Sequence, residues 1–134
     1  MVSGDFTDFL ARIAAHNKEF PGLAYRIIGF ARNPVGDAAV VLQQPVVKIQ
    51  RNAETAEEDI DAELQHRGFM RIPGKTAYEQ DSWVSADGQI EITDARPDNV
   101  LTGQDGRLYF IDTIIKDSEF TNKSPEELFN AINP

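Results

Sequence analysis

The segment at residues 90–112 constrains the fold of this chain most strongly, because three short apolar runs alternate there with residues that favour turns. Asp94 follows the first run, Asn99 directly precedes the second, and Asp112 ends the third. The dipeptide Asp105-Gly106 lies between the last two runs and favours a tight turn. We therefore expect the last two runs to pair as an antiparallel hairpin that places Asn99 and Asp112 at the same end.

The polar residues of this segment have two interpretations. Two oxygen ligands with a third carboxylate nearby would suit a hard divalent cation and the phosphate oxygens that it carries. Alternatively, Asp94, Asp98 and Asn99 are turn residues, since Asp and Asn side chains hydrogen-bond their own backbone at the ends of strands. The spacing of Asp94 and Asn99 alone is too common a pattern to decide between these interpretations.

The spacing Asp94-x-x-x-x-Asn99, followed by a hairpin and then Phe110-Ile-Asp112, resembles the catalytic segment of the protein-kinase-like fold. Within that superfamily, these residues are most similar to the small kinase-like domains found in polyvalent proteins of phages and other mobile elements. The resemblance implies that Asp94 is the catalytic base and that Asn99 and Asp112 are magnesium ligands. It also implies Mg²⁺ and ATP as cofactors.

Three further residues have an expected role, two of them through the resemblance. The connector Gln43-Gln-Pro45 lies where the kinase hinge contacts adenine, which implies that Gln43 and Gln44 bind the nucleotide. Arg96 could contact a phosphate, or it could form an ion pair with Asp94 or Asp112.

The sequence also departs from the kinase pattern. That pattern includes a Gly-rich loop and a strand lysine paired with a helix glutamate, and no G-x-G-x-x-G occurs in this chain. Glu19 is a candidate remnant of the glutamate, and Lys18 and Lys48 are the nearest lysines. Thr113-Ile114 replaces the usual Phe-Gly, and the chain is short after Asp112. We expect a degenerate or truncated kinase-like protein that binds magnesium-nucleotide, with impaired or absent independent phosphoryl transfer.

The remaining sequence predicts an α+β fold of antiparallel hairpins and about three helices, in one domain over residues 1–134. Apolar residues at helical spacing and capping signals predict helices at residues 8–19, at 55–67 and after Ser124. Strand formers and turn signals predict a hairpin of residues 25–32 with 38–42 and another of 83–86 with 89–92. Residues 46–49 and 69–72 are expected to be extended.

Two helices begin with local capping signals. Thr55-Ala-Glu-Glu58 has the pattern of a capping box, in which the Thr hydroxyl accepts from a backbone amide and the Glu carboxylate reaches back. Ser124-Pro-Glu-Glu127 combines an N-cap, a proline at the first helical position and a glutamate at the third. Both signals predict where a helix starts.

Composition limits the classes of partner. Thirteen basic and twenty-two acidic side chains give a net charge of −9, which opposes binding to nucleic-acid backbones. There is no cysteine, and no apolar run approaches the ~18 residues of a membrane span. We therefore expect a cytoplasmic protein with no nucleic-acid or membrane partner. The alternative function is a non-catalytic module of unrelated α+β fold that binds a protein partner.

Overall fold

The structure is a computed structural model that describes residues 4–32, 35, 38–49, 54–76 and 81–134. Its helices are α1 (Gly4–Glu19), α2 (Glu57–His66) and α3 (Pro125–Ile132), with short 3-10 turns η1 (Pro21–Leu23), η2 (Pro97–Asn99) and η3 (Ser118–Phe120). Its strands are β1 (Arg26–Arg32), β2 (Ala38–Gln43), β3 (Phe69–Ile72), β4 (Ser82–Ser85), β5 (Ile90–Thr93), β6 (Val100–Thr102), β7 (Leu108–Phe110) and β8 (Ile114–Asp117).

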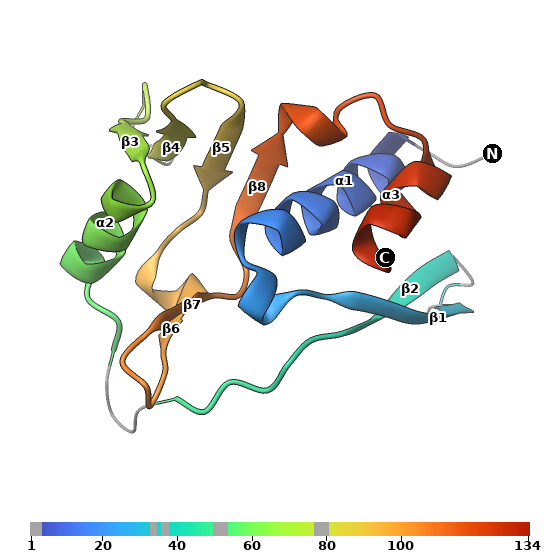
Figure 1. The fold of residues 1–134 in the computed structure, drawn as a ribbon, viewed down its shortest axis with the longest axis horizontal. Helices are drawn as coiled ribbons and strands as arrows, with labels where there is room; N and C mark the ends of the chain where they lie inside the picture. Colours follow the sequence, from blue (N-terminus) through green and yellow to red (C-terminus); the bar gives the residue numbers. More distant parts are fainter. Residues whose placement is uncertain (1–3, 33–34, 36–37, 50–53, 77–80) are drawn as a thin grey trace.

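The strands form three antiparallel sheets, which confirms the predicted α+β class. One sheet has the order β3-β4-β5-β8, and β1-β2 and β6-β7 are separate hairpins. In Figure 1, α2 and β3–β5 lie on one side of the molecule, and α1, α3, β1 and β2 lie on the other. Strand β8 stands between the two sides, because it pairs with β5 and packs against α1.

Helix α1 packs its apolar face against β8 and α3. Leu10, Ile13 and Ala14 are buried on that face, as their helical spacing predicts. The helix starts at Gly4, earlier than the expected residue 8, and ends at Glu19 as predicted. Buried apolar side chains from both sides of the molecule form one core. They include Phe20, Ile60, Leu64, Trp83, Ile92, Val100, Phe110, Ile115 and Leu128.

The predicted hairpins form, and two of their turns contain an Asp-Gly dipeptide. Gly88 lies between β4 and β5 with a φ of +74°, and Gly106 lies between β6 and β7 with a φ of +81°. These left-handed angles carry no steric penalty for glycine, which explains both Asp-Gly dipeptides. The hairpin of β1 and β2 also forms, with a register shift between Ile27 and Gly29.

Helix starts follow the capping signals in only one of the two cases. At α3 the Ser124 hydroxyl accepts from the Glu127 amide, and the complete capping box is present. At α2 the predicted cap is wrong: Ala56 is the N-cap residue and makes no side-chain cap. The Thr55 hydroxyl is instead buried and hydrogen-bonds the Thr102 hydroxyl at 2.8 Å, so a contact distant in sequence replaces the local one.

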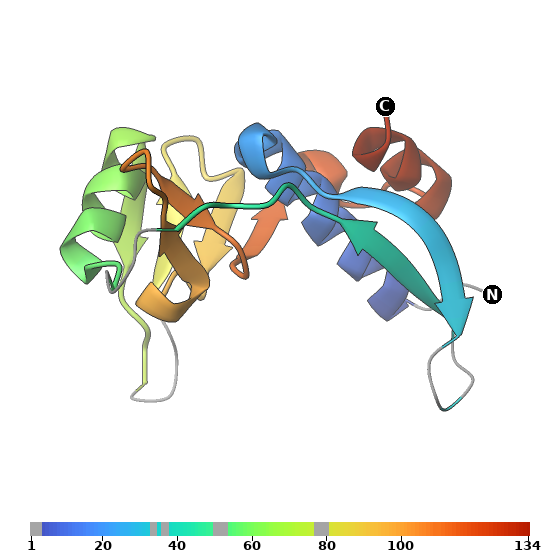
Figure 2. The same cartoon turned by 90° about the horizontal axis from the view of Figure 1, so that it is seen from below.

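The connector after β2 crosses from the β1–β2 side towards α2 and the β6–β7 hairpin (Figures 1 and 2). Residues 46–49, which the sequence predicts to be extended, belong to none of the strands, and Ile49 makes an isolated bridge to Gly103. Strand β8 was not predicted at all. Among the described residues, none of the helices has the length and apolar character that crossing a bilayer requires.

Candidate functional site

The turn after β5 holds two of the predicted site residues in direct contact. Asp94 follows β5 with a φ of 64°, which is unfavourable for most residues but tolerated by Asp. Asn99 ends η2, is 7% exposed, and donates from Nδ2 to the Asp94 backbone carbonyl at 2.8 Å. This hydrogen bond closes the turn and fixes the Asn99 amide, so that its Oδ1 points away from the Asp94 carbonyl.

The Asp94 carboxylate lies beside a guanidinium group. Its Oδ1 is 3.1 Å from Arg96 Nε, which is the first of the expected ion pairs for Arg96. The same Oδ1 is buried and has no hydrogen bond to any described residue, so this contact is one of charge rather than of aligned donor and acceptor. Arg96 lines a cavity of about 420 Å³ that also includes Trp83 and Asp98 but not Asp112.

The β6–β7 hairpin brings Asp112 next to this turn through the backbone. Val100 pairs with Phe110, and the Ile111 amide donates to the Asn99 carbonyl at 3.0 Å. Asn99 and Asp112 therefore lie at the same end of the hairpin, as the sequence predicts. The Asp112 side chain is exposed, and within the described part of the chain it has no hydrogen bond or ion pair.

Asp112 lines a cavity of about 210 Å³ between α1, β2 and the segment that enters β8. Phe9, Ile13 and Leu42 provide apolar surface, and Arg12 lines the same cavity from α1. This cavity shares no lining residue with the one beside Arg96, so Arg96 and Asp112 line different cavities.

Tyr25 and Gln44 connect the hinge-like connector to the Asp112 cavity. The Tyr25 hydroxyl donates to the Ile111 carbonyl at 2.9 Å, and Gln44 Nε2 donates to the Leu23 carbonyl at 3.2 Å. Burial raises the pKa of Tyr25, a hydrogen bond with Gln44 opposes this rise, and the charge of Asp112 adds to it. Gln44 therefore lies beside the site, near Tyr25.

Gln43 lies at a different kind of position. It is the last residue of β2, is exposed, and pairs with Arg26 on the neighbouring strand. Within the described part of the chain, no recorded contact joins it to Asp94, Asn99 or Asp112. The two adjacent glutamines thus differ in their contacts, because Gln43 pairs within the β1–β2 hairpin and Gln44 bonds to Leu23.

The proposed remnants of the kinase ion pair have structural partners instead. Glu19 Oε1 is 3.2 Å from Arg67 Nη1, and Lys18 Nζ is 3.0 Å from Asp117 Oδ2 and 3.1 Å from Glu119 Oε2. These contacts tie α1 to α2 and to the end of β8. In this structure Glu19 therefore pairs with Arg67 and not with a lysine.

Sequence reasoning missed Arg12, Tyr25 and Thr113 as residues around Asp112. Arg12 and Tyr25 reach the cavity only through the packing of α1 and β1, which no local pattern reveals. Thr113 stands where the kinase motif has Phe, and in the described part of the chain its buried Oγ1 has no hydrogen-bond partner. The chain order alone contains no signal for these three.

Of the comparisons with known proteins, the one with family models gives a match. The model of a family described as "Serine/Threonine/Tyrosine Kinase found in polyvalent proteins" matches residues 2–119, which is most of the chain. No curated protein and no solved structure matches it. The alternative of an unrelated α+β fold is thereby excluded. The chain belongs to the family of Ser/Thr/Tyr kinase domains found in polyvalent proteins.

Proposed function

We propose that this kinase-like domain binds a magnesium-nucleotide, with Asn99 and Asp112 as metal ligands and Asp94 as the base, and that its own phosphoryl transfer is impaired. The observation that carries the proposal is the orientation of the Asn99 amide. Its Nδ2 is committed to the Asp94 carbonyl, and among the described residues nothing donates to its Oδ1. An amide oxygen that is fixed but unused is suited to a metal ion.

The donor set fits magnesium that arrives with phosphates rather than a metal held by protein alone. Among the described residues, no group of three His, Cys, Asp or Glu side chains is arranged to hold a metal ion. Mg²⁺ typically takes one or two carboxylates and completes its coordination with waters and substrate phosphates. Asn99 and the unpaired Asp112 carboxylate are a donor set of this kind, and the bound ion would neutralise phosphate charge.

The connector after β2 supports nucleotide binding at the other end of the site. No described hydrogen bond uses the backbone amides or carbonyls of residues 44–47. Backbone groups that are free in this way can pair with the edge of a purine ring, as the kinase hinge does. The Gln44 side chain would hold this segment in place through its bonds to Leu23 and Tyr25.

Impaired transfer follows from the surroundings of the proposed base. Asp94 must accept a proton from an attacking hydroxyl, and hydrogen-bond reach to that hydroxyl is the first requirement. Its Oδ1 is buried and lies 3.1 Å from Arg96 Nε, so this oxygen is shielded by a cation. Only Oδ2 is left for the acceptor. We expect turnover far below the 1–100 s⁻¹ that is typical of kinases.

The test is calorimetric titration of the 134-residue protein with ATP, with and without magnesium. We expect magnesium-dependent binding that Asp112→Ala abolishes. Asp98→Asn is the control, because Asp98 is an exposed carboxylate in the turn that contains Asp94 and Asn99. This variant should bind Mg-ATP like the unmodified protein. Absence of binding in every condition, or equal loss in the control, would refute nucleotide binding at this site.

Transfer is measured separately by the release of ADP in the presence of magnesium. We expect slow release that Asp94→Asn reduces further, since Asn cannot accept the proton. Release at a rate typical of kinases would contradict the proposed impairment. Slow release that Asp94→Asn leaves unchanged would remove Asp94 from the role of base.

A further inference from the structure

The cavity that Asp112 lines has charges of opposite sign on two of its walls. Asp112 lies on the segment that enters β8, and Arg12 lies on α1. Within the described part of the chain, neither has an ion-pair partner within 4.0 Å, and they do not pair with each other. The cavity of about 210 Å³ therefore separates an unpaired cation from an unpaired carboxylate.

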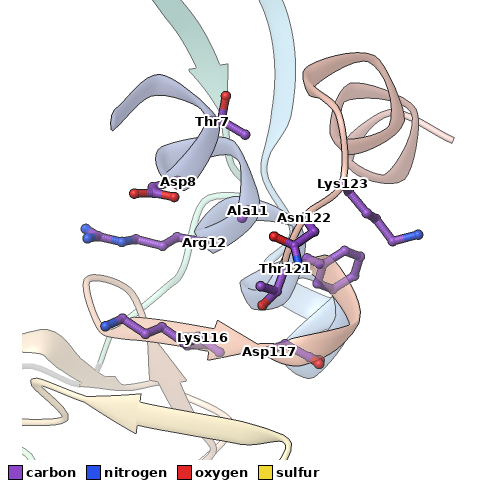
Figure 3. Close-up of a pocket in the computed structure, with 11 residues that line it drawn as sticks. Thr7, Asp8, Ala11, Arg12, Lys116, Asp117, Thr121, Asn122 and Lys123 are labelled. Carbon is purple, nitrogen blue, oxygen red and sulfur yellow. The ribbon is translucent and has the colours of Figure 1, made fainter. Parts of the chain in front are cut away.

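Arg12 also lines a second, larger cavity of about 530 Å³ between α1 and the β8–η3 segment. Figure 3 shows the Arg12 and Lys116 side chains extending to one side of this cavity, where β8 begins. Lys123 extends to the other side, and its Nζ is 4.0 Å from Glu127 Oε2. Arg12 thus lines both cavities, and its side chain extends to the side on which β8 begins.

Among the described side chains of α1, none forms an ion pair with Arg12. Asp8 is one helical turn earlier, which is the spacing of a favourable ion pair, and yet no pair within 4.0 Å forms. Arg12 is exposed, so it remains available to a ligand. Thr113 lines the same cavity as Arg12, and its buried Oγ1 has no hydrogen-bond partner among the described residues.

We propose that Arg12 binds the phosphate groups of the nucleotide and supplies the positive charge that kinase-like sites take from a strand lysine. This inference rests on the proposed function, because it needs a nucleotide whose magnesium lies at Asp112. A guanidinium group offers a planar fork of donors that can hold two phosphate oxygens at once. The carboxylate wall would then face the metal and the guanidinium wall the phosphates, with the ligand filling the gap between them.

The test compares the binding of Mg-ATP and of adenosine to the full chain by calorimetry. Arg12→Gln should weaken Mg-ATP binding about ten- to a hundredfold, which is the effect of losing a hydrogen bond to a charged group. Adenosine binding should be unchanged, because adenosine has no phosphate. Arg12→Lys should restore part of the Mg-ATP affinity, since it keeps the charge but not the fork.

Lys123→Gln is the matched control, because it removes one positive charge at the far side of the larger cavity. It should leave both affinities unchanged. Mg-ATP binding that Arg12→Gln leaves at the level of the unmodified protein would overturn the role of Arg12 alone. Equal weakening of adenosine and Mg-ATP would also overturn it, since the effect would then not involve phosphate. Failure of the unmodified protein to bind Mg-ATP would instead overturn the proposed function, and this inference with it.

Discussion

The buried imidazole of His16 makes the stability of this domain depend on pH in the mildly acidic range. His16 is 4% exposed, and its Nε2 lies 3.0 Å from the Leu23 carbonyl. Because a carbonyl can only accept, Nε2 carries the hydrogen and a second proton would have to enter at Nδ1. The ring is packed against Phe20 and Tyr25, with centroids 5.5 and 5.0 Å away. This burial lowers the pKa of His16 from 6.5, and the hydrogen bond to Leu23 opposes the effect only in part.

The sign of the effect follows from proton linkage. As the pH falls below 6.5, the unfolded chain binds a proton at His16 that the folded chain does not, so the free energy of unfolding decreases. One such proton changes this free energy by at most about 1.4 kcal/mol per pH unit. Between about pH 7.5 and about pH 5.5, the loss from His16 is therefore at most about 1.4 kcal/mol.

The assay is urea unfolding at several pH values, for the unmodified protein and for His16→Gln. Glutamine can still donate to the Leu23 carbonyl but does not titrate. The change with pH is measured within each variant, so a constant loss caused by the substitution cancels. We expect the unmodified protein to lose about 1 kcal/mol more than His16→Gln on acidification. His66→Gln, at an exposed position of α2, is the control and should behave like the unmodified protein. Equal pH dependence for the unmodified protein and His16→Gln would refute the reasoning.

Three substitutions test other contacts. Phe110→Ala should lower the free energy of unfolding by about 3–5 kcal/mol, because Phe110 is fully buried and stacks on Phe20 at 4.7 Å; urea unfolding measures this. Ser124→Ala should cost about 1 kcal/mol in the same assay, through loss of the α3 capping box. Asn99→Ala should cost about 1 kcal/mol through the lost bond to Asp94 and should also weaken Mg-ATP binding in calorimetry. A change below about 0.3 kcal/mol in any of the three would contradict the contact concerned.

The sequence predicted those elements whose cause is local. The dipeptides Asp87-Gly88 and Asp105-Gly106 set the turns of two hairpins, because glycine alone reaches the required φ without penalty. Strand β8 was missed because Ile114 and Ile115 are too short an apolar run to predict a strand, and β8 becomes a strand by pairing with β5, more than twenty residues earlier. The predicted cap of α2 was wrong for the same reason, since the Thr55 hydroxyl forms its hydrogen bond with Thr102, which is distant in the sequence.

In the candidate site, too, the sequence predicted the contacts that are local in the chain and missed the one that depends on the packing of distant elements. Asn99 contacts the Asp94 carbonyl five residues away, within one turn, so the sequence placed this pair together correctly. Asp112 joins them through the register of a single hairpin, which the sequence also predicted. Arg12 comes from a helix one hundred residues earlier in the chain, and only the packing of α1 on β8 brings it to the Asp112 cavity.

The charged side chains of α1 are of two kinds. Some form ion pairs that hold the fold together, and one has no such pair and can bind a ligand. Near the end of the helix, Lys18 contacts Asp117, whose side chain is 3% exposed, and Glu19 contacts Arg67. Removing Lys18 would leave a buried carboxylate unpaired, which is costly, so the fold depends on this lysine. Hydrogen bonds to Asp117 and Glu119 accordingly raise the pKa of Lys18. Arg12, two turns earlier, stabilises no described carboxylate, so its desolvation is not part of the cost of folding. Folding does not require the positive charge of Arg12. Its guanidinium group can therefore bind a phosphate beside Asp112 without competition from a paired carboxylate.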